Sequence, residues 1–185
     1  MIYGERLRLR ALERSDLEHF VKWLNDPEVT RGLSHVAPLS FAAEENWFDG
    51  MLTRSVHERP LMIDIRLGDE WLPVGDLGFS TIDWRASCAE FGIVIGEKAY
   101  WDQGYGSEAI LLLLGHGFGT LNLNRISLRV FATNARARHA YQKIGFREEG
   151  RLRQAEYREG QYVDVILMSV LKSEWEGIKN APSQP

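Results

Sequence analysis

A glycine-containing turn between a strand and a helix constrains the fold of this chain more than any other feature. Residues 100–109 read Tyr-Trp-Asp-Gln-Gly-Tyr-Gly-Ser-Glu-Ala, after a β-rich run that ends near residue 96 and before an apolar helical run. Glycines let the backbone approach a ligand closely, and the free N–H groups of the first helical turn then face an anion, most naturally a pyrophosphate. We therefore predict a phosphate-binding cradle at this turn, with two glycines that only ease a tight turn as the alternative.

Two other nucleotide-binding turns are weighed against this cradle. Residues 104–109 match the dinucleotide pattern G-x-G-x-x-A, but about seven residues separate Gly96 from Gly104, whereas a Rossmann helix opens directly from its strand. The next predicted strand, residues 125–131, also ends without the acid that binds a ribose. We reject the Rossmann interpretation. A Walker loop is excluded because the chain contains no Gly-Lys-Ser or Gly-Lys-Thr triplet.

A second motif occupies residues 134–146. Asn134 is a natural helix N-cap and Gly145 a natural helix stop. Between them, Tyr141 belongs to an i, i+3, i+4, i+7 stripe and is expected on the packed face of the helix, where a core aromatic is one interpretation.

The rest of the chain predicts a mixed domain over residues 1–171 and a loose tail over residues 172–185. Ser15 and Glu18 have the spacing of a capping box at the start of the first helix. The strands are expected at residues 6–12, 61–67, 72–83, 87–96, 125–131, 146–152 and 161–171, and the helices at residues 15–24, 40–52, 107–121 and 134–144.

Composition narrows the functional classes. The length of 185 residues suits one domain, no apolar run is long enough to span a bilayer, and no secretion signal is visible, so we expect a cytoplasmic protein that does not cross a membrane. Cys88 is the only cysteine and the histidines lack metal-ligand spacing, so we expect no metal. The net charge of −4 disfavours nucleic acid as a partner and is compatible with a cationic substrate.

Both motifs together resemble the GNAT superfamily of acetyl-coenzyme A dependent N-acetyltransferases, over nearly the whole chain. Residues 7–10 (Leu-Arg-Leu-Arg), 23–29 (Trp-Leu-Asn-Asp-Pro-Glu-Val), 100–101 (Tyr-Trp) and 149–153 (Glu-Gly-Arg-Leu-Arg) look like its RimJ/RimL-like branch. The resemblance implies an α+β (α/β) fold: a mixed, mostly antiparallel sheet of about seven strands, flanked by about four helices, with one splayed strand pair. Two positions depart from common family patterns: Trp101 where Gln or Arg is frequent, and Ala137 where many relatives carry Ser.

The family fold also implies where acetyl-CoA binds. The strand at residues 90–96 would splay from residues 125–131, so that pantetheine adds to the backbone of Ile93, Val94 and Ile95 as an extra strand. The pyrophosphate would bind the N–H groups of the cradle, and Asn134 would reach the pantetheine arm. The cradle residues implied in this way are Gln103, Gly104, Tyr105, Gly106 and Ser107. Arg138 would either contact a coenzyme phosphate or lie as a solvated helix charge.

The resemblance assigns two catalytic candidates. Tyr141 stands four residues before Gly145, where family members place the tyrosine that protonates the leaving sulfur. The attacking amine must lose a proton, and Glu90 is the candidate base, although a solvent-facing strand charge is the alternative. The acceptor would be a small-molecule or peptide amine, such as a protein N-terminus, polyamine, aminoglycoside or amino sugar. An exposed strand edge would allow a homodimer, and an inactive CoA-binding sensor is the competing function.

Overall fold

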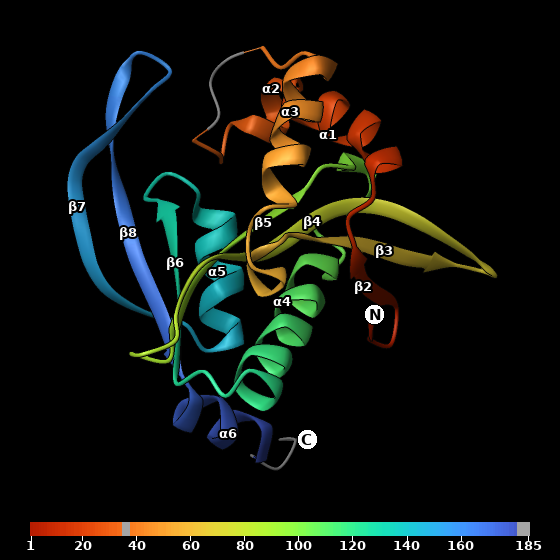
Figure 1. The fold of residues 1–185 in the computed structure, drawn as a ribbon. Coiled ribbons are helices and arrows are strands. Elements are labelled where there is room, and N and C mark those ends of the chain that lie inside the picture. Colours follow the sequence, from red (N-terminus) through yellow and green to blue (C-terminus); the bar gives the residue numbers. More distant parts are fainter. Residues whose placement is uncertain (35–37, 181–185) are drawn as a thin grey trace. The chain divides into compact units, whose positions relative to one another are not determined.

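The computed structural model describes residues 1–34 and 38–180. Its strands are β1 (Ile2–Tyr3), β2 (Leu7–Ala11), β3 (Leu61–Leu67), β4 (Glu70–Asp83), β5 (Cys88–Ile95), β6 (Arg125–Phe131), β7 (Arg147–Arg158) and β8 (Gln161–Leu171) (Figure 1). Its helices are α1 (Leu17–Leu24), α2 (Pro27–Thr30), α3 (Phe41–Met51), α4 (Tyr105–Gly115), α5 (Ala135–Ile144) and α6 (Lys172–Asn180). These elements confirm the predicted mixed fold. The short β1, α2 and α6 are the ones that the sequence patterns missed.

The strands are hydrogen-bonded in the order β1-β2-β3-β4-β5-β6-β8-β7. The pairs β1–β2, β2–β3, β3–β4, β6–β8 and β7–β8 are antiparallel, whereas β5 and β6 are parallel. That parallel register joins Cys88 to Arg125 and stops after Glu90 and Ser127. The early end of the pairing agrees with the predicted splayed pair.

Contacts within the chain divide it into two compact units. Unit 1 comprises Met1–Thr81 and Gly92–Leu113, and unit 2 comprises Ile82–Phe91 and the chain from Leu114 onward. Strands β4 and β5 and helix α4 each run from one unit into the other. The division does not test the expectation of a single domain over residues 1–171, which stays a prediction.

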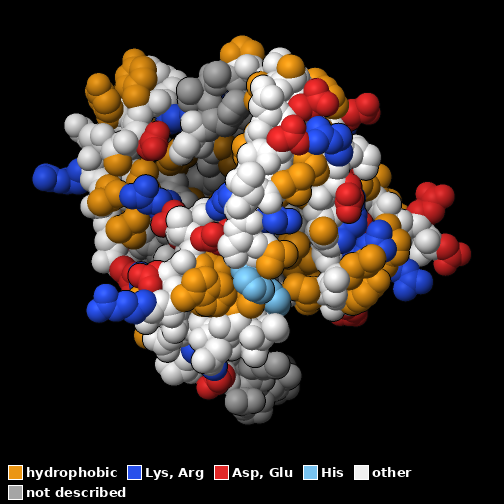
Figure 2. Space-filling model, in the orientation of Figure 1, with side chains coloured by type: hydrophobic (Ala, Val, Ile, Leu, Met, Phe, Trp, Pro, Cys, Tyr) orange, Lys and Arg blue, Asp and Glu red, His pale blue; other side chains and the backbone are white. Residues whose placement is uncertain are grey.

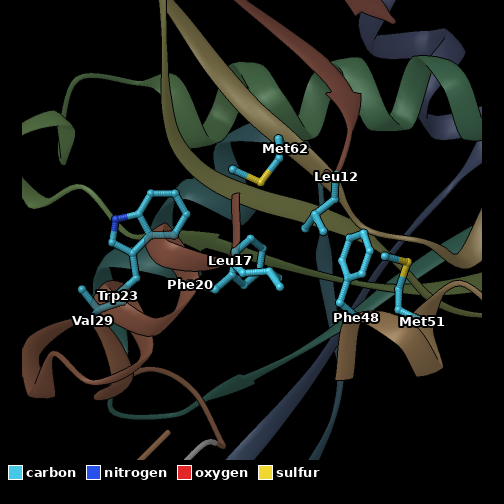
Figure 3. Packing of buried hydrophobic residues seen from close by; sticks show 8 residues of the cluster. All are labelled: Leu12, Leu17, Phe20, Trp23, Val29, Phe48, Met51 and Met62. Carbon is cyan, nitrogen blue, oxygen red and sulfur yellow. The ribbon is translucent and has the colours of Figure 1, made fainter. Parts of the chain in front are cut away.

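In unit 1, helices α1 and α3 bury apolar side chains against the sheet. The cluster, drawn in Figure 3, consists of Leu12, Leu17, Phe20, Trp23, Val29, Phe48, Met51 and Met62. Leu17, Phe20 and Trp23 are spaced three residues apart, and helical periodicity therefore places them on one face of α1. Each fully buried side chain of this size contributes about 1.5–3 kcal/mol to folding.

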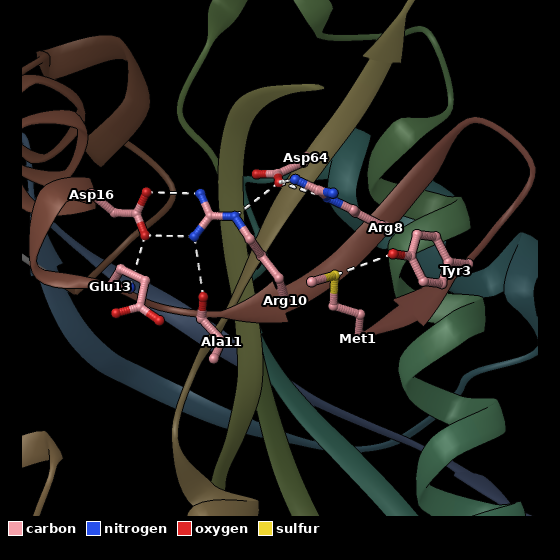
Figure 4. A network of polar contacts seen from close by, with 8 residues as sticks. All are labelled: Met1, Tyr3, Arg8, Arg10, Ala11, Glu13, Asp16 and Asp64. Carbon is pink, nitrogen blue, oxygen red and sulfur yellow. Dashed lines mark hydrogen bonds and ion pairs between the residues drawn. The ribbon is translucent and has the colours of Figure 1, made fainter. Parts of the chain in front are cut away.

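A network of charged side chains in unit 1 joins β2 to β3 and to the start of α1 (Figure 4). The Arg10 guanidinium donates to Asp64 at 2.8 Å and to both carboxylate oxygens of Asp16 at 2.7 and 2.8 Å. Arg8 forms a further ion pair with Asp64 at 2.9 Å. Both aspartates are buried, so the arginines compensate for the loss of hydration of the two carboxylates.

In unit 2, β8 pairs with β6 on one side and with β7 on the other. Helix α5 begins at its cap, Asn134, and ends at Gly145, whose φ of 109° is readily adopted by glycine. The Phe118 ring lies 6.2 Å from the Trp175 ring of α6.

Two predictions on local structure need correction. The capping box is formed by Glu13 and Asp16 around a short 3-10 turn, not by Ser15 and Glu18, because the Asp16 carboxylate accepts from the Glu13 N–H while Arg10 holds it. The predicted loose tail is helical over Lys172–Asn180, where Glu174 accepts from the Leu171 N–H and pairs with Arg147. Residues 181–185 of that tail lie outside the described residues.

Candidate active site

The end of β5 is fixed in position by close backbone packing within unit 1. A Cβ on Gly75 would lie 2.0 Å from the Val94 carbonyl oxygen, and a Cβ on Gly96 would lie 2.1 Å from the Trp23 indole. Only glycine therefore allows β4 and α1 to approach the strand end this closely. The Gly96 N–H also donates to the Val74 carbonyl at 2.8 Å.

Trp101 completes this arrangement. Its indole N–H donates to the Ile95 carbonyl at 2.7 Å, and its ring packs against the apolar cluster under α1. The residue that departs from the common family pattern thus orients the backbone where the resemblance places the cofactor arm. Ile93, Val94 and Ile95 are half-buried.

The residues predicted to form a phosphate cradle lie at the start of α4. Gly104 has φ of 83°, a conformation that favours glycine, and its carbonyl accepts from the Glu108 N–H at 3.0 Å. The N–H groups of Tyr105, Gly106 and Ser107 find no acceptor among the described residues, as expected for a first helical turn. Three unpaired donors on the positive end of a helix dipole suit a phosphate group.

The cradle lies beside the end of β5. A Cβ built on Gly106 would meet side-chain atoms of Ile95 at 3.6 Å and of Ile93 at 3.9 Å, which are ordinary contacts. Unit 1 therefore brings together all eight cofactor-binding residues predicted between Ile93 and Ser107.

Arg6 is a residue at this site that the sequence patterns missed. Its guanidinium donates to the Gln103 carbonyl at 3.0 Å, pairs with Glu108 at 2.8 Å and lies 4.7 Å from the centre of the Tyr105 ring. These contacts hold the loop and add positive charge next to it. No motif signals this role, because Arg6 is far from the loop in sequence.

Tyr141 and Glu90 belong to unit 2. The Tyr141 ring lies edge-on to Phe91 at 6.4 Å and to Phe146 at 6.0 Å, and its hydroxyl has no hydrogen-bond partner among the described residues. Burial raises the pKa of Tyr141 to about 12, so the phenol stays protonated at neutral pH. Glu90 is half-buried on β5, in register with Ser127 of β6.

Asn134 and Arg138 are already engaged within unit 2. The Asn134 side-chain oxygen caps α5 by accepting from the Ala137 N–H at 3.1 Å. Arg138 forms an ion pair with Glu148 at 3.3 Å, while its Nε is buried without a partner. Arg138 is thus neither a freely solvated charge nor, in this conformation, wholly available to a phosphate.

Comparison with known proteins decides the family. The model of the acetyltransferase (GNAT) domain family matches residues 6–147. The chain belongs to the GNAT acetyltransferases. A GNAT N-acetyltransferase is therefore confirmed as the enzyme class, and acetyl-CoA as the cofactor of that class, as the resemblance implied.

Two relatives and one solved structure resemble the chain over almost its full length. An uncharacterised N-acetyltransferase, p20 of Bacillus licheniformis, is 32% identical over 95% of this chain and 98% of its own. A spermidine N(1)-acetyltransferase of Vibrio cholerae is 30% identical over 93% of this chain and 96% of its own. The crystal structure of a V. cholerae spermidine N-acetyltransferase in complex with CoA and spermine superposes with a TM-score of 0.85, at 28% identity, over 94% of this chain and 99% of the other.

The described residues carry neither of two features that would indicate other functions. None of their helices has both the length and the apolar character needed to cross a bilayer. Among them, no three His, Cys, Asp or Glu side chains are grouped so as to hold a metal ion. On the face drawn in Figure 2, Lys and Arg side chains lie next to Asp and Glu side chains, so both signs of charge are mixed there.

Proposed function

We propose that this GNAT enzyme acetylates a primary amine of a small polycationic acceptor, by direct attack of the amine within a ternary complex. The observation that carries the proposal is the similarity to a spermidine N(1)-acetyltransferase over 93% of the chain. The net charge of −4 favours a cationic acceptor over an anionic one. A peptide N-terminus is the second acceptor class, and the homodimer stays a prediction.

The residues of unit 1 suit the proposed cofactor contacts. The N–H groups of residues 105–107 would hold the pyrophosphate, and the backbone of residues 93–95 would bind the pantetheine arm. Bound acetyl-CoA would supply an activated acetyl thioester. In unit 2, the remaining donor of the Asn134 amide and the buried Nε of Arg138 are available for further polar contacts.

Tyr141 is proposed as the acid that protonates the leaving thiolate. A phenol with a pKa of about 12 keeps its proton across the working pH range, and its hydroxyl is not committed to another group among the described residues. A thiol, with an ordinary pKa near 8.5, leaves readily even without an acid, so the contribution of Tyr141 is moderate.

We expect Tyr141→Phe to lower kcat about 10- to 100-fold while the dissociation constant for acetyl-CoA stays unchanged. Thiol-release assays measure kcat, and calorimetric titration measures the dissociation constant for acetyl-CoA. Tyr3→Phe, which alters an exposed phenol on β1, is the matched control and should behave as the parent. Unchanged kcat in Tyr141→Phe would make the tyrosine a packing residue only.

Glu90 is proposed as the base that removes a proton from the acceptor amine. We expect Glu90→Gln to lower kcat at least about tenfold at pH 7, with a smaller deficit at high pH where more of the amine is already neutral. Glu70→Gln, at an exposed position on β4, is the control. A pH profile of kcat parallel to that of the parent would remove Glu90 from this role.

The function itself is tested by titrating acetyl-CoA into the protein and then assaying thiol release with spermidine, alanyl peptides, aminoglycosides and amino sugars. Binding followed by turnover with the polyamine supports the proposal. Turnover with peptides alone would move the acceptor to the second class. Binding without turnover of any amine would favour the CoA sensor, and absence of binding would contradict the cradle.

A further inference from the structure

Two acidic side chains in unit 1 have no cationic partner among residues 1–34 and 38–180. Glu44 on α3 is only 3% exposed, and Asp76 on β4 is half-buried. Neither carboxylate forms a hydrogen bond or an ion pair with a described residue. An uncompensated buried charge is expensive, so natural proteins usually pair such groups or use them.

Strand register and helical periodicity place the two acidic residues next to members of one apolar cluster. Asp76 stands directly across from Met62 in the β3–β4 register, so both side chains lie on the same face of the sheet. Glu44 is one helical turn before Phe48 and shares its face of α3. Met62 and Phe48 pack in the same cluster (Figure 3).

The Glu44 charge also acts on Asp76. Burial, together with the Glu44 charge, raises the pKa of Asp76 to about 7. Burial also raises the pKa of Glu44. Asp16 and Asp64 in the same unit are compensated by Arg10 and Arg8, whereas Glu44 and Asp76 have no ion pair with a described residue.

The carboxylate oxygens are not sealed from solvent. Within the described residues, the only buried side-chain nitrogen and oxygen atoms without a partner are Asp64 Oδ1 and Arg138 Nε. The oxygens of Glu44 and Asp76 do not belong to this fully buried group, so each retains a small exposure to solvent. A group that enters from solvent can therefore contact them.

The pair also lies close to the strand end where the cofactor arm is proposed to bind. Asp76 follows Gly75, whose Cα packs against the Val94 carbonyl. The Val94 side chain in turn contacts the apolar cluster beside which Glu44 and Asp76 lie.

We propose that Glu44 and Asp76 together bind the protonated amino group of the acceptor, with the adjacent apolar cluster lining the path of its alkyl chain. This inference rests on the proposed function and specifies the acceptor as an alkylammonium. An ammonium has three donors and one charge, which two carboxylates can satisfy. A hard metal cation would require more oxygen ligands than this pair offers.

The test measures amine affinity apart from catalysis. Spermidine is titrated calorimetrically into protein saturated with CoA, which carries no acetyl group to transfer. We expect Glu44→Gln and Asp76→Asn each to weaken spermidine binding about 10- to 100-fold, since each removes a charged hydrogen-bond partner. Glu45→Gln changes the neighbouring, more exposed residue on the same helix and should bind spermidine as the parent does.

Three outcomes separate the explanations. CoA affinity should stay unchanged in all variants, and a parent protein that binds no CoA would contradict the proposed function rather than the acid pair. A parent that binds CoA but not spermidine, or Glu44→Gln and Asp76→Asn variants that bind spermidine as tightly as Glu45→Gln, would overturn the inference. Urea unfolding confirms that the variants are folded, because removal of an unpaired buried acid should not destabilise them.

Discussion

Replacing Arg10 with glutamine is expected to lower the free energy of unfolding by about 3–5 kcal/mol, the largest loss of stability that we predict for a single substitution in this chain. The guanidinium bridges Asp64 and Asp16, whose side chains are 2% and 6% exposed. Without it, Asp16 keeps only the backbone N–H of Glu13 and Asp64 keeps only Arg8. Two buried carboxylates would then be undercompensated.

Urea denaturation at pH 7.5 measures this loss. The matched control is Arg147→Gln, because Arg147 is 73% exposed and its ion pair with Glu174 should contribute no more than about 1 kcal/mol. A loss in Arg10→Gln no larger than in the control would show that the network adds nothing beyond surface pairing.

The effect of Arg10→Gln should also depend on pH. Burial alone would raise the pKa of Asp16, but the hydrogen bonds from Arg10 and the Glu13 N–H, together with the charges of Arg10 and His19, lower it overall. Because the pKa of Asp16 is lowered in the folded state, its contribution to stability is present above the ordinary pKa of 3.8. That contribution is lost as the pH falls through the pKa of the folded state. The difference between the parent and Arg10→Gln should therefore narrow below about pH 4.

The local backbone conformations of the candidate site follow from nearby residues in the sequence. Gly104 and Gly106 mark the cradle because a turn that opens a helix needs glycine and leaves unpaired N–H groups wherever it occurs. The stripe through Tyr141 and the cap at Asn134 are likewise set by residues within one helix. Patterns of this kind survive in any tertiary context.

The features that the sequence did not predict depend on residues that are far apart in the chain. Arg6 reaches the Gln103 carbonyl across 97 positions, and no local pattern brings them together. Glu44 is buried on α3, and no local sequence pattern signals this burial. The true capping box was also missed, because Asp16 is held by Arg10 on a neighbouring strand rather than by its own helix.

Asp76→Asn is expected to stabilise the protein by about 2–4 kcal/mol at pH 8 relative to its effect at pH 4. The folded state holds the Asp76 proton up to a pKa of about 7, whereas the unfolded chain releases it near 3.8. Because the pKa of Asp76 is raised in the folded state, its contribution to stability is complete below the pKa of the unfolded chain. That contribution is lost as the pH rises through the pKa of the folded state. Asparagine does not ionise, so the stability of the variant does not fall in this way as the pH rises.

Urea denaturation of the parent and Asp76→Asn at pH 4, 5, 6, 7 and 8 measures the change, and Glu45→Gln should show no comparable trend. Curves for parent and variant that stay parallel across this range would mean that Asp76 titrates as an exposed aspartate. A widening gap, together with the loss of spermidine affinity expected of the same variant, would show that this position gives up stability in order to bind a cation.

Because the ammonium would supply the missing positive charge, spermidine in the presence of CoA should stabilise the parent more at pH 8 than it stabilises Asp76→Asn.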